Sequence, residues 1–377
     1  MRQTQKLSKK GRVTLIDVAA AGERFEQRGR GAISNQAGRF EHETHAAFDD
    51  GWGTIDDEAA RLKTTLTREV AKTIITYNRS PDISFDRTIN PYRGCEHGCV
   101  YCFARPTHAF HGLSAGLDFE SRIFFKPGGP DLLRRELSRP SYVPKPIALG
   151  MNTDAYQPVE RQLKLTRTFL EILSAHNHPV TLLTKSALIQ RDIDIIAPMA
   201  AKGIARVGVS ITTLDPRLSR RMEPRAAAPY KRLQTVRALA DAGIEVIVMT
   251  APIIPALNEH EIEPLLEAAA DNGARSAGYV LLRLPFELKD IFHEWLAEHY
   301  PDRAARIINL LRAMRGGQDY DSNWFERGRG QGPHARLIAQ RFQKAARRLR
   351  LDTPRSRLRT DLFCPPEGPN GQLKLDV

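Results

Sequence analysis

The chain has 377 residues, and its 56 Lys and Arg against 44 Asp and Glu give a formal net charge of +12. Hydrophobic residues make up 41% and charged residues 27%, a globular composition that excludes a disordered or fibrous chain. No apolar run is long enough to span a bilayer, and the basic start, Met1 to Gly11, lacks the apolar core of a secretory signal. We therefore expect no membrane association. The surplus of positive charge favours polyanionic partners, nucleic acid among them, without choosing between them.

Residues 1–86 hold Gly–Arg elements and scattered charges without a clear period. We expect them to form an irregular N-terminal arm that covers the main domain or is partly disordered. From residue 87, short apolar runs alternate with helical patterns. The predicted strands are Thr88–Tyr92, Ile123–Lys126, Pro146–Met151, Val180–Lys185, Arg206–Thr212, Glu245–Ala251 and Gly278–Leu284. Several are continuous apolar runs, which are typical of parallel strands buried on both faces.

Helical spacing separates these strands. Apolar residues recur at three and four residues in three segments: Leu165 to Leu173, Leu233 to Ala240 and Ile262 to Ala269. Alternating strands and helices predict an α/β fold of βαβ units over residues 87–286, wound into an open or closed barrel with its site at the carboxyl ends of the strands. Residues 287–377 form a C-terminal extension, with helices predicted at Phe286–His299, Arg303–Met314 and His334–Leu349 and an irregular tail from Asp352.

Three of the four cysteines lie in one short segment, Cys95, Cys99 and Cys102, with the spacing C-x3-C-x2-C. Clustered thiols in a long chain without a signal peptide indicate a metal site in a reducing cytoplasm. Three thiolates on one loop can hold three corners of a 4Fe–4S cluster and leave the fourth iron open. The alternative is a structural zinc site, which needs a fourth ligand, for which His97, His108 and His111 are the nearby candidates. Cys364 is expected to be an incidental free thiol.

The cysteine motif, with Tyr101 at its aromatic position, resembles the signature of the radical S-adenosylmethionine (SAM) superfamily. Other segments resemble the bacterial members related to spore photoproduct lyase: Asn90–His108, Thr153–Glu160, Ser210–Asp215, Glu223–Arg225 and Ala251–Asn258. The resemblance runs from about residue 75 to residue 350. It implies a partial (β/α)6 TIM-like barrel with a 4Fe–4S cluster and SAM as cofactors. It also implies reduction by flavodoxin or ferredoxin and cleavage of SAM to methionine and a 5′-deoxyadenosyl radical, which abstracts hydrogen from the substrate.

The resemblance also suggests cofactor contacts at the strand ends. Asn152, Thr153 and Asp154 follow the Pro146–Met151 strand, where the superfamily usually binds the methionine amine. Lys185 ends the next strand and is a candidate for the SAM carboxylate, or else a solvated lysine. Ser210 is a candidate for the ribose, and Glu223 either reaches the ribose or braces the site.

The substrate class stays open at this point. One possibility is nucleic acid, and another is a small molecule or peptide, since related folds host many reactions. A third interpretation is a zinc-stabilised nucleic-acid-binding module without catalysis. Photoproduct lyases place a hydrogen-donating cysteine where this sequence has Met151, and a thioether has no S–H to give.

Overall fold

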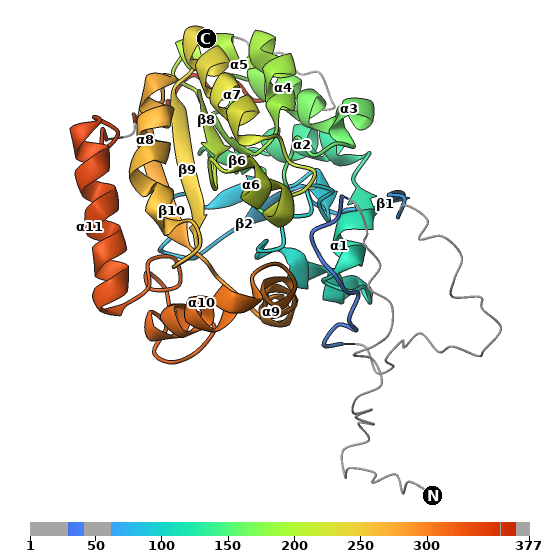
Figure 1. The fold of residues 1–377 in the computed structure, drawn as a ribbon. Helices are drawn as coiled ribbons and strands as arrows, with labels where there is room; N and C mark the ends of the chain where they lie inside the picture. Colours follow the sequence, from blue (N-terminus) through green and yellow to red (C-terminus); the bar gives the residue numbers. More distant parts are fainter. Residues whose placement is uncertain (1–28, 41–61, 355, 367–377) are drawn as a thin grey trace, which may run out of the picture.

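The computed structural model describes residues 29–40, 62–354 and 356–366 (Figure 1). Its centre is a seven-stranded sheet in the order β10-β9-β8-β7-β6-β3-β2. Six strands are parallel: β3 (Arg87–Ile89), β6 (Ile147–Leu149), β7 (Val180–Thr184), β8 (Ala205–Ser210), β9 (Val246–Ile253) and β10 (Ser276–Leu281). The edge strand β2 (Ile75–Tyr77) runs antiparallel to β3. The predicted α/β fold with a parallel sheet is therefore confirmed.

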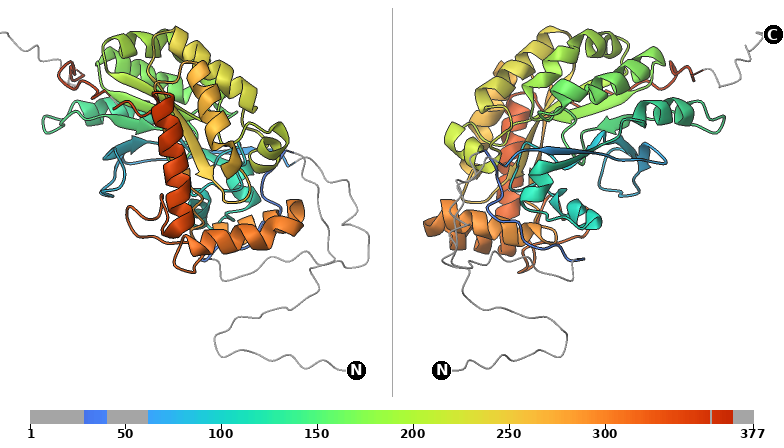
Figure 2. Two further views of the ribbon diagram at one scale, coloured as in Figure 1. Left: turned by 60° about the vertical axis from the view of Figure 1, so that its left-hand side comes forward. Right: turned by 90° about the vertical axis from the view of Figure 1, so that its right-hand side faces the viewer.

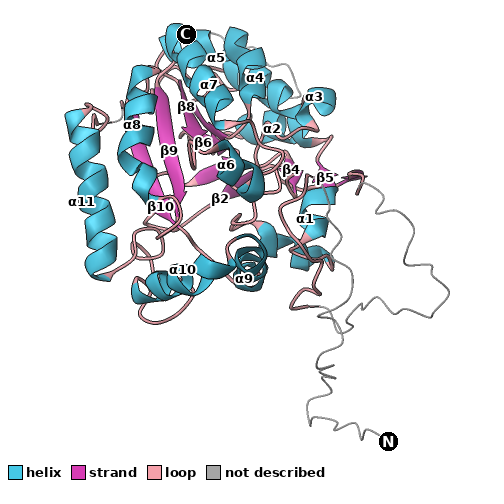
Figure 3. Cartoon of the chain, viewed as in Figure 1, coloured by secondary structure: helices cyan, strands magenta, loops and turns pink. Residues whose placement is uncertain are grey.

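Helices that connect the parallel strands cover the outer face of this sheet, as Figure 3 shows in cyan. They are α3 (Glu160–Leu163), α4 (Leu165–Ala175), η2 (Ala187–Asp192), α5 (Ile193–Ala201), α6 (Pro216–Met222), α7 (Pro229–Asp241), η3 (Glu259–Glu261) and α8 (Ile262–Asp271). The apolar side chains of α4 and α7 pack on strand residues such as Val207, which is fully buried. This packing forms the main hydrophobic core between the sheet and its helices. Strand β8 lies at its centre, and all of its residues are buried.

A second, three-stranded sheet lies beside the first. Its strands are β1 (Thr65–Arg68), β5 (Arg122–Phe125) and β4 (Tyr92–Arg93), in the order β1-β5-β4. The short elements η1 (Arg105–His111), α1 (Leu117–Ser121) and α2 (Gly129–Leu137) join it to the main sheet. Our expectation that residues 1–86 are wholly irregular is wrong for β1 and β2, since each pairs with a strand from the following part of the chain. These strands are short and mostly exposed, so they lack the apolar runs that revealed the others.

Three helices follow the barrel, as predicted: α9 (Leu288–His299), α10 (Pro301–Ala313) and α11 (Gly332–Arg348). Helices α9 and α10 pack on the cysteine loop in the second apolar cluster, which includes Trp295 and Val100, and α11 packs against α8 (Figure 2). The tail after Asp352 has no helix or strand within its described residues, as expected. No helix in the described part of the chain is long and apolar enough to cross a membrane.

The sheet is an open barrel whose two edges are joined by the loop after α10. The backbone N–H of Leu281, at the end of β10, donates to the Gly328 carbonyl of this loop at 2.9 Å. Arg327 in the same loop donates two hydrogen bonds of 2.6 Å to Asp82, in the turn before β3. The inner faces of β7 to β10 line a cavity of about 1080 Å³, and Met151 and Met249 also border it. We call this cavity the lumen of the barrel. The loop after α10 links its two sides, because it bonds both to β10 and to the turn before β3.

Candidate active site

The three clustered cysteines lie on the loop that follows β3 and β4. Gly94 and Gly98 both have positive φ, 76° and 67°, which a residue with a Cβ rarely adopts. There is also no room for a Cβ at either position, because it would lie 2.8 Å from the Phe119 carbonyl at Gly94 and 2.8 Å from a Glu120 oxygen at Gly98. The glycines therefore let the loop fold tightly enough to bring its thiols together.

Cys95 and Cys99 are buried and Cys102 is half-buried, whereas Cys364 is exposed on the distant tail. The three loop thiols are close enough for the charge of one to act on the others. Burial raises the pKa of Cys95 well above its usual value and that of Cys99 to about 12. Binding a metal must therefore displace protons from these thiols, as thiolate ligation does in general.

The donor set fits a cluster better than a single ion. Among residues 29–40, 62–354 and 356–366, no three His, Cys, Asp or Glu side chains are grouped as the ligands of one ion would be. Thiolates that each bind a different iron of a 4Fe–4S cluster need not meet at one point. The candidate zinc ligands have other contacts, since His97 lies 3.3 Å from Asp154 and Nε2 of His108 is 2.9 Å from the Arg122 carbonyl.

Two side chains that we had not singled out hold the loop backbone. Gln157 donates to the Gly94 carbonyl at 3.1 Å and accepts from the Glu96 N–H at 2.9 Å. Arg105, fully buried, donates to the Cys99 carbonyl at 2.8 Å and pairs with buried Glu120. Because these bonds fix main-chain atoms of the loop, they orient the thiols without touching them.

Asp154 ties the cysteine loop to the end of β7. One carboxylate oxygen accepts from the Tyr156 N–H at 2.9 Å and the Thr184 hydroxyl at 2.7 Å, and the other from the Lys185 N–H at 2.8 Å. Burial alone would raise the pKa of Asp154, but His97 and these hydrogen bonds hold it at about 2. Asp154 is therefore an ionised brace, and its direct contact with SAM stays a prediction.

The neighbouring predicted contacts also support the loop. The Thr153 hydroxyl donates to the Tyr92 carbonyl at 3.2 Å, and the Asn152 backbone N–H donates to the Asn90 side chain at 3.0 Å. Both bonds join the residues after β6 to the strand that leads into the cysteine loop. The structure thus places Asn152, Thr153 and Asp154 beside the loop, and their predicted contacts with the methionine amine stay predictions.

Lys185 lies at the end of β7, and its side chain turns towards the cysteine loop. Its ammonium nitrogen is 5.7 Å from the centre of the Tyr101 ring. Burial lowers the pKa of Lys185, but the charges of Cys99 and Glu223 outweigh this and raise it overall. The lysine is therefore a cation beside the cysteine loop, and its binding of the SAM carboxylate stays a prediction.

A buried charged network supports Tyr101. The Tyr101 hydroxyl donates to Glu223, and Glu223 pairs with Arg232 at 2.5 Å. Arg232, which the sequence did not reveal, also donates to the Ser210 carbonyl at 3.2 Å. Burial would raise the pKa of Glu223, yet Arg232 and Lys185 lower it overall. Glu223 is thus placed to brace the aromatic residue of the motif, one of its two expected roles, and Ser210 stays a predicted ribose contact.

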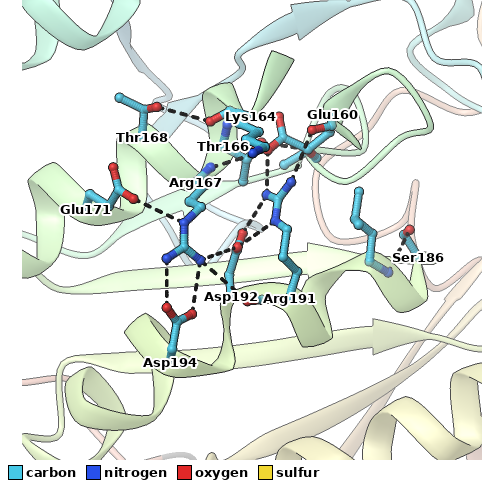
Figure 4. A network of polar contacts seen from close by, with 12 residues as sticks. Glu160, Lys164, Thr166, Arg167, Thr168, Glu171, Ser186, Arg191, Asp192 and Asp194 are labelled. Carbon is cyan, nitrogen blue, oxygen red and sulfur yellow. Dashed lines mark hydrogen bonds and ion pairs between the residues drawn. The ribbon is translucent and has the colours of Figure 1, made fainter. Parts of the chain in front are cut away.

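A second polar network joins α3, α4 and η2 (Figure 4). The Tyr92 hydroxyl donates to Glu160, which is fully buried. Arg191 reaches both Glu160 and buried Asp192 at 2.7 Å, and Arg167 reaches Asp192 at 2.9 Å. Each buried carboxylate is therefore neutralised by a guanidinium, and the network anchors β4 to α4 and η2.

Comparisons with known proteins agree with this geometry. The model of the radical SAM superfamily matches residues 89–269. An uncharacterized protein of Mycobacterium tuberculosis strain H37Rv is 37% identical over 232 residues, which cover 61% of this chain and 68% of that protein. The chain belongs to the radical SAM superfamily. A second uncharacterized relative, from Methanocaldococcus jannaschii, is 28% identical over 253 residues, or 67% of this chain and 90% of the relative.

Among solved structures, the radical SAM fold of this chain is similar to that of spore photoproduct lyase complexed with dinucleoside spore photoproduct. The TM-score is 0.54 at 17% identity, and the match covers 77% of this chain and 81% of the lyase. A mutant of the same lyase matches with a TM-score of 0.55. At this identity the similarity shows the fold alone. Membership in the superfamily makes the chain a radical SAM enzyme, which overturns the interpretation as a non-catalytic zinc module.

Proposed function

We propose that this enzyme uses a 4Fe–4S cluster, held by Cys95, Cys99 and Cys102, to cleave SAM reductively. The observation that carries the proposal is the glycine-shaped loop with three neighbouring thiols, which faces a lysine at the end of β7. Three soft thiolate ligands suit three irons of such a cluster and leave the fourth for SAM. When bound, the cluster supplies one electron that breaks the C5′–S bond, giving methionine and a 5′-deoxyadenosyl radical that takes a hydrogen atom from the substrate.

The surrounding residues would orient the cofactor and keep water away. Lys185 is the candidate partner for the SAM carboxylate, because its ammonium lies near the Tyr101 ring and is not hydrogen-bonded to a carboxylate within the described residues. Asp154 and Glu223 have their carboxylates engaged by protein donors. We assign them to positioning the loop and Tyr101, so their effect on SAM acts through those groups.

We further propose nucleic acid as the substrate class and a reduced flavodoxin or ferredoxin as the electron donor, in the cytoplasm where thiols stay reduced. Support for the first comes from the net charge of +12 and from a fold shared with a lyase that was solved with a dinucleoside photoproduct. Met151 borders the lumen and has no S–H. We therefore do not propose photoproduct repair with a cysteine hydrogen donor at this position.

The cluster assignment is tested by changing each cysteine to Ala and measuring iron and sulfide after anaerobic reconstitution. We expect Cys95→Ala, Cys99→Ala and Cys102→Ala to lose the intact cluster, because each removes a thiolate of the loop. Cys364→Ala is the matched control and should keep about four irons per chain. Full retention of the cluster in Cys99→Ala, or its loss in Cys364→Ala, would contradict the assignment.

A further inference from the structure

Within the described part of the chain, the guanidinium of Arg283 at the mouth of the barrel has no acidic partner. It lies two residues after β10, at the carboxyl end of that strand, and is half-buried. Its single hydrogen bond within residues 29–40, 62–354 and 356–366 is a 3.3 Å contact from Nη2 to the Tyr320 hydroxyl. Its Nε atom is buried, and no other atom of these described residues accepts a hydrogen bond from it. Because unpaired buried donors are costly, this arrangement indicates a ligand that accepts hydrogen bonds.

A second arginine lies beside it. Arg315 is 2% exposed and donates to two neutral carbonyls, those of Leu282 and Glu326, each at 2.8 Å. Burial and the charge of Arg283 lower the pKa of Arg315, and Asp321 acts on it only at longer range. Two positive charges thus lie together with no carboxylate hydrogen-bonded to either one in the described part of the chain. An anion near Arg283 would relieve their repulsion.

Aromatic rings surround the guanidinium of Arg283. Its central carbon lies 5.3 Å from the ring centre of Phe103 and 6.0 Å from that of Tyr320. Phe103 directly follows Cys102 and is 46% exposed, so this group borders the cysteine loop. The loop that carries Tyr320 also carries Trp324, which is 56% exposed. Exposed rings next to arginine are the features that bind stacked bases and their phosphates in single-stranded nucleic acids.

From these contacts we infer that Arg283 is a substrate-positioning residue that binds a backbone phosphate of a nucleic acid, with Phe103 stacking on an adjacent base. The inference rests on the proposed nucleic-acid substrate. It concerns a part of the mouth separate from Lys185, since β8 and β9 lie between β7 and β10 in the sheet. The planar fork of a guanidinium can donate two parallel hydrogen bonds to a phosphate, which a lysine cannot reproduce.

The test measures binding of a fluorescein-labelled single-stranded oligonucleotide of about ten nucleotides by anisotropy, using the full chain reconstituted anaerobically. We expect Arg283→Gln to weaken binding about tenfold. The negative slope of log K against log salt concentration should become shallower by about one, because one phosphate contact is lost. Arg283→Lys keeps the charge and should keep the salt slope while losing part of the affinity. Arg347→Gln on α11, where the side chain is 83% exposed, is the matched control and should change neither quantity.

The outcomes separate this inference from the proposals that it rests on. Retained cluster iron and an unchanged circular-dichroism spectrum would show that the Arg283 variants are folded. If the wild type binds the oligonucleotide and Arg283→Gln binds it equally well with the same salt slope, the role of Arg283 is overturned and the substrate class survives. If the wild type does not bind the oligonucleotide, both fail, while the cleavage of SAM is judged by its own product.

Discussion

Lys185 shows how a single residue decides between two interpretations of this site. From the sequence alone it was equally a solvated lysine or the partner of a carboxylate. In the structure its ammonium lies 5.7 Å from the Tyr101 ring, and the proximity of Cys99 and Glu223 raises the pKa of Lys185 and so favours its charged form. No carboxylate of the described residues is hydrogen-bonded to this ammonium, so it can bind one, and the SAM carboxylate is the anion that our proposal brings there.

We predict that Lys185→Met keeps its cluster but binds SAM at least about tenfold more weakly. A charge-assisted hydrogen bond contributes roughly 1.5–3 kcal/mol, which corresponds to about a tenfold to hundredfold change in affinity. Equilibrium titration of the reconstituted variant with SAM measures this. Lys202→Met is a suitable control, because Lys202 is exposed and bonds to Asn177, away from the loop. An unchanged SAM affinity in Lys185→Met would return this lysine to a solvent-facing role.

At the scale of elements, the N-terminal arm contributes to the site. Its described segment, residues 29–40, lies on the cysteine loop, as Gly31 and Ala32 donate backbone N–H bonds of 2.9 and 2.8 Å to Glu120. Glu120 is the carboxylate that also pairs with Arg105. A Cβ on Gly31 would lie 1.8 Å from the Gly98 carbonyl, so the two backbones are in direct contact. Residues 29–40 therefore lie against the cysteine loop, while the expectation that the arm as a whole covers the main domain stays a prediction.

We predict that Gly31→Ala lifts this segment and exposes the cluster to solvent. Forcing a methyl group against backbone atoms costs roughly 1–3 kcal/mol, enough to open the segment several-fold to a hundredfold more often. The rate at which air bleaches the visible absorbance of the reconstituted protein measures this exposure, and we expect it to rise several-fold. Gly128→Ala is the control, because nothing lies within 4 Å of a Cβ at that position. Equal bleaching rates in Gly31→Ala and the wild type would argue against a protective arm.

The sequence predicted the elements that carry a strong periodic pattern. Six of the seven predicted strands are present within a few residues, and the buried parallel ones among them are continuous apolar runs, as in Val246–Ile253. The seventh, Thr88–Tyr92, is wrong as a single strand, because Asn90 and Pro91 separate β3 of the large sheet from β4 of the small one. The exposed strands β1 and β2 have no such run and were missed. The site residues at strand ends were predicted from their place in the order of elements. Their partners were not, since Arg232 lies nine residues beyond Glu223 on another helix and Glu120 meets the arm across 89 positions of sequence.

At the scale of the whole molecule, two buried histidines make the free energy of unfolding depend on pH. His178 bonds to the Tyr142 hydroxyl at 2.7 Å and contacts the Pro179 carbonyl at 3.0 Å, and burial lowers its pKa to about 4. Burial likewise lowers the pKa of His108 to about 4. As the pH falls, these histidines take up protons near their ordinary pKa of 6.5 in the unfolded chain but only near pH 4 in the folded chain. Stability is therefore complete above that value and falls as the pH drops towards 4.

We predict a fall in the free energy of unfolding of about 1.4 kcal/mol per pH unit for each of these histidines between pH ~6.5 and ~4. Denaturant unfolding at a series of pH values measures it. His178→Gln removes one titrating group, so its stability should depend less steeply on pH than that of the wild type. His260→Gln is the control, because His260 is exposed, in η3. A wild-type stability that stays level as the pH drops from 6.5 to 4 would contradict this account.

The central claim is that this chain cleaves SAM reductively at the cluster of the three-cysteine loop. The most direct measurement is chromatography of the products after the reconstituted protein is incubated anaerobically with dithionite and SAM. We expect slow formation of 5′-deoxyadenosine and methionine by the wild type, even without a substrate, and none by Cys99→Ala. A wild-type protein with an intact, reduced cluster that forms no 5′-deoxyadenosine would contradict the claim.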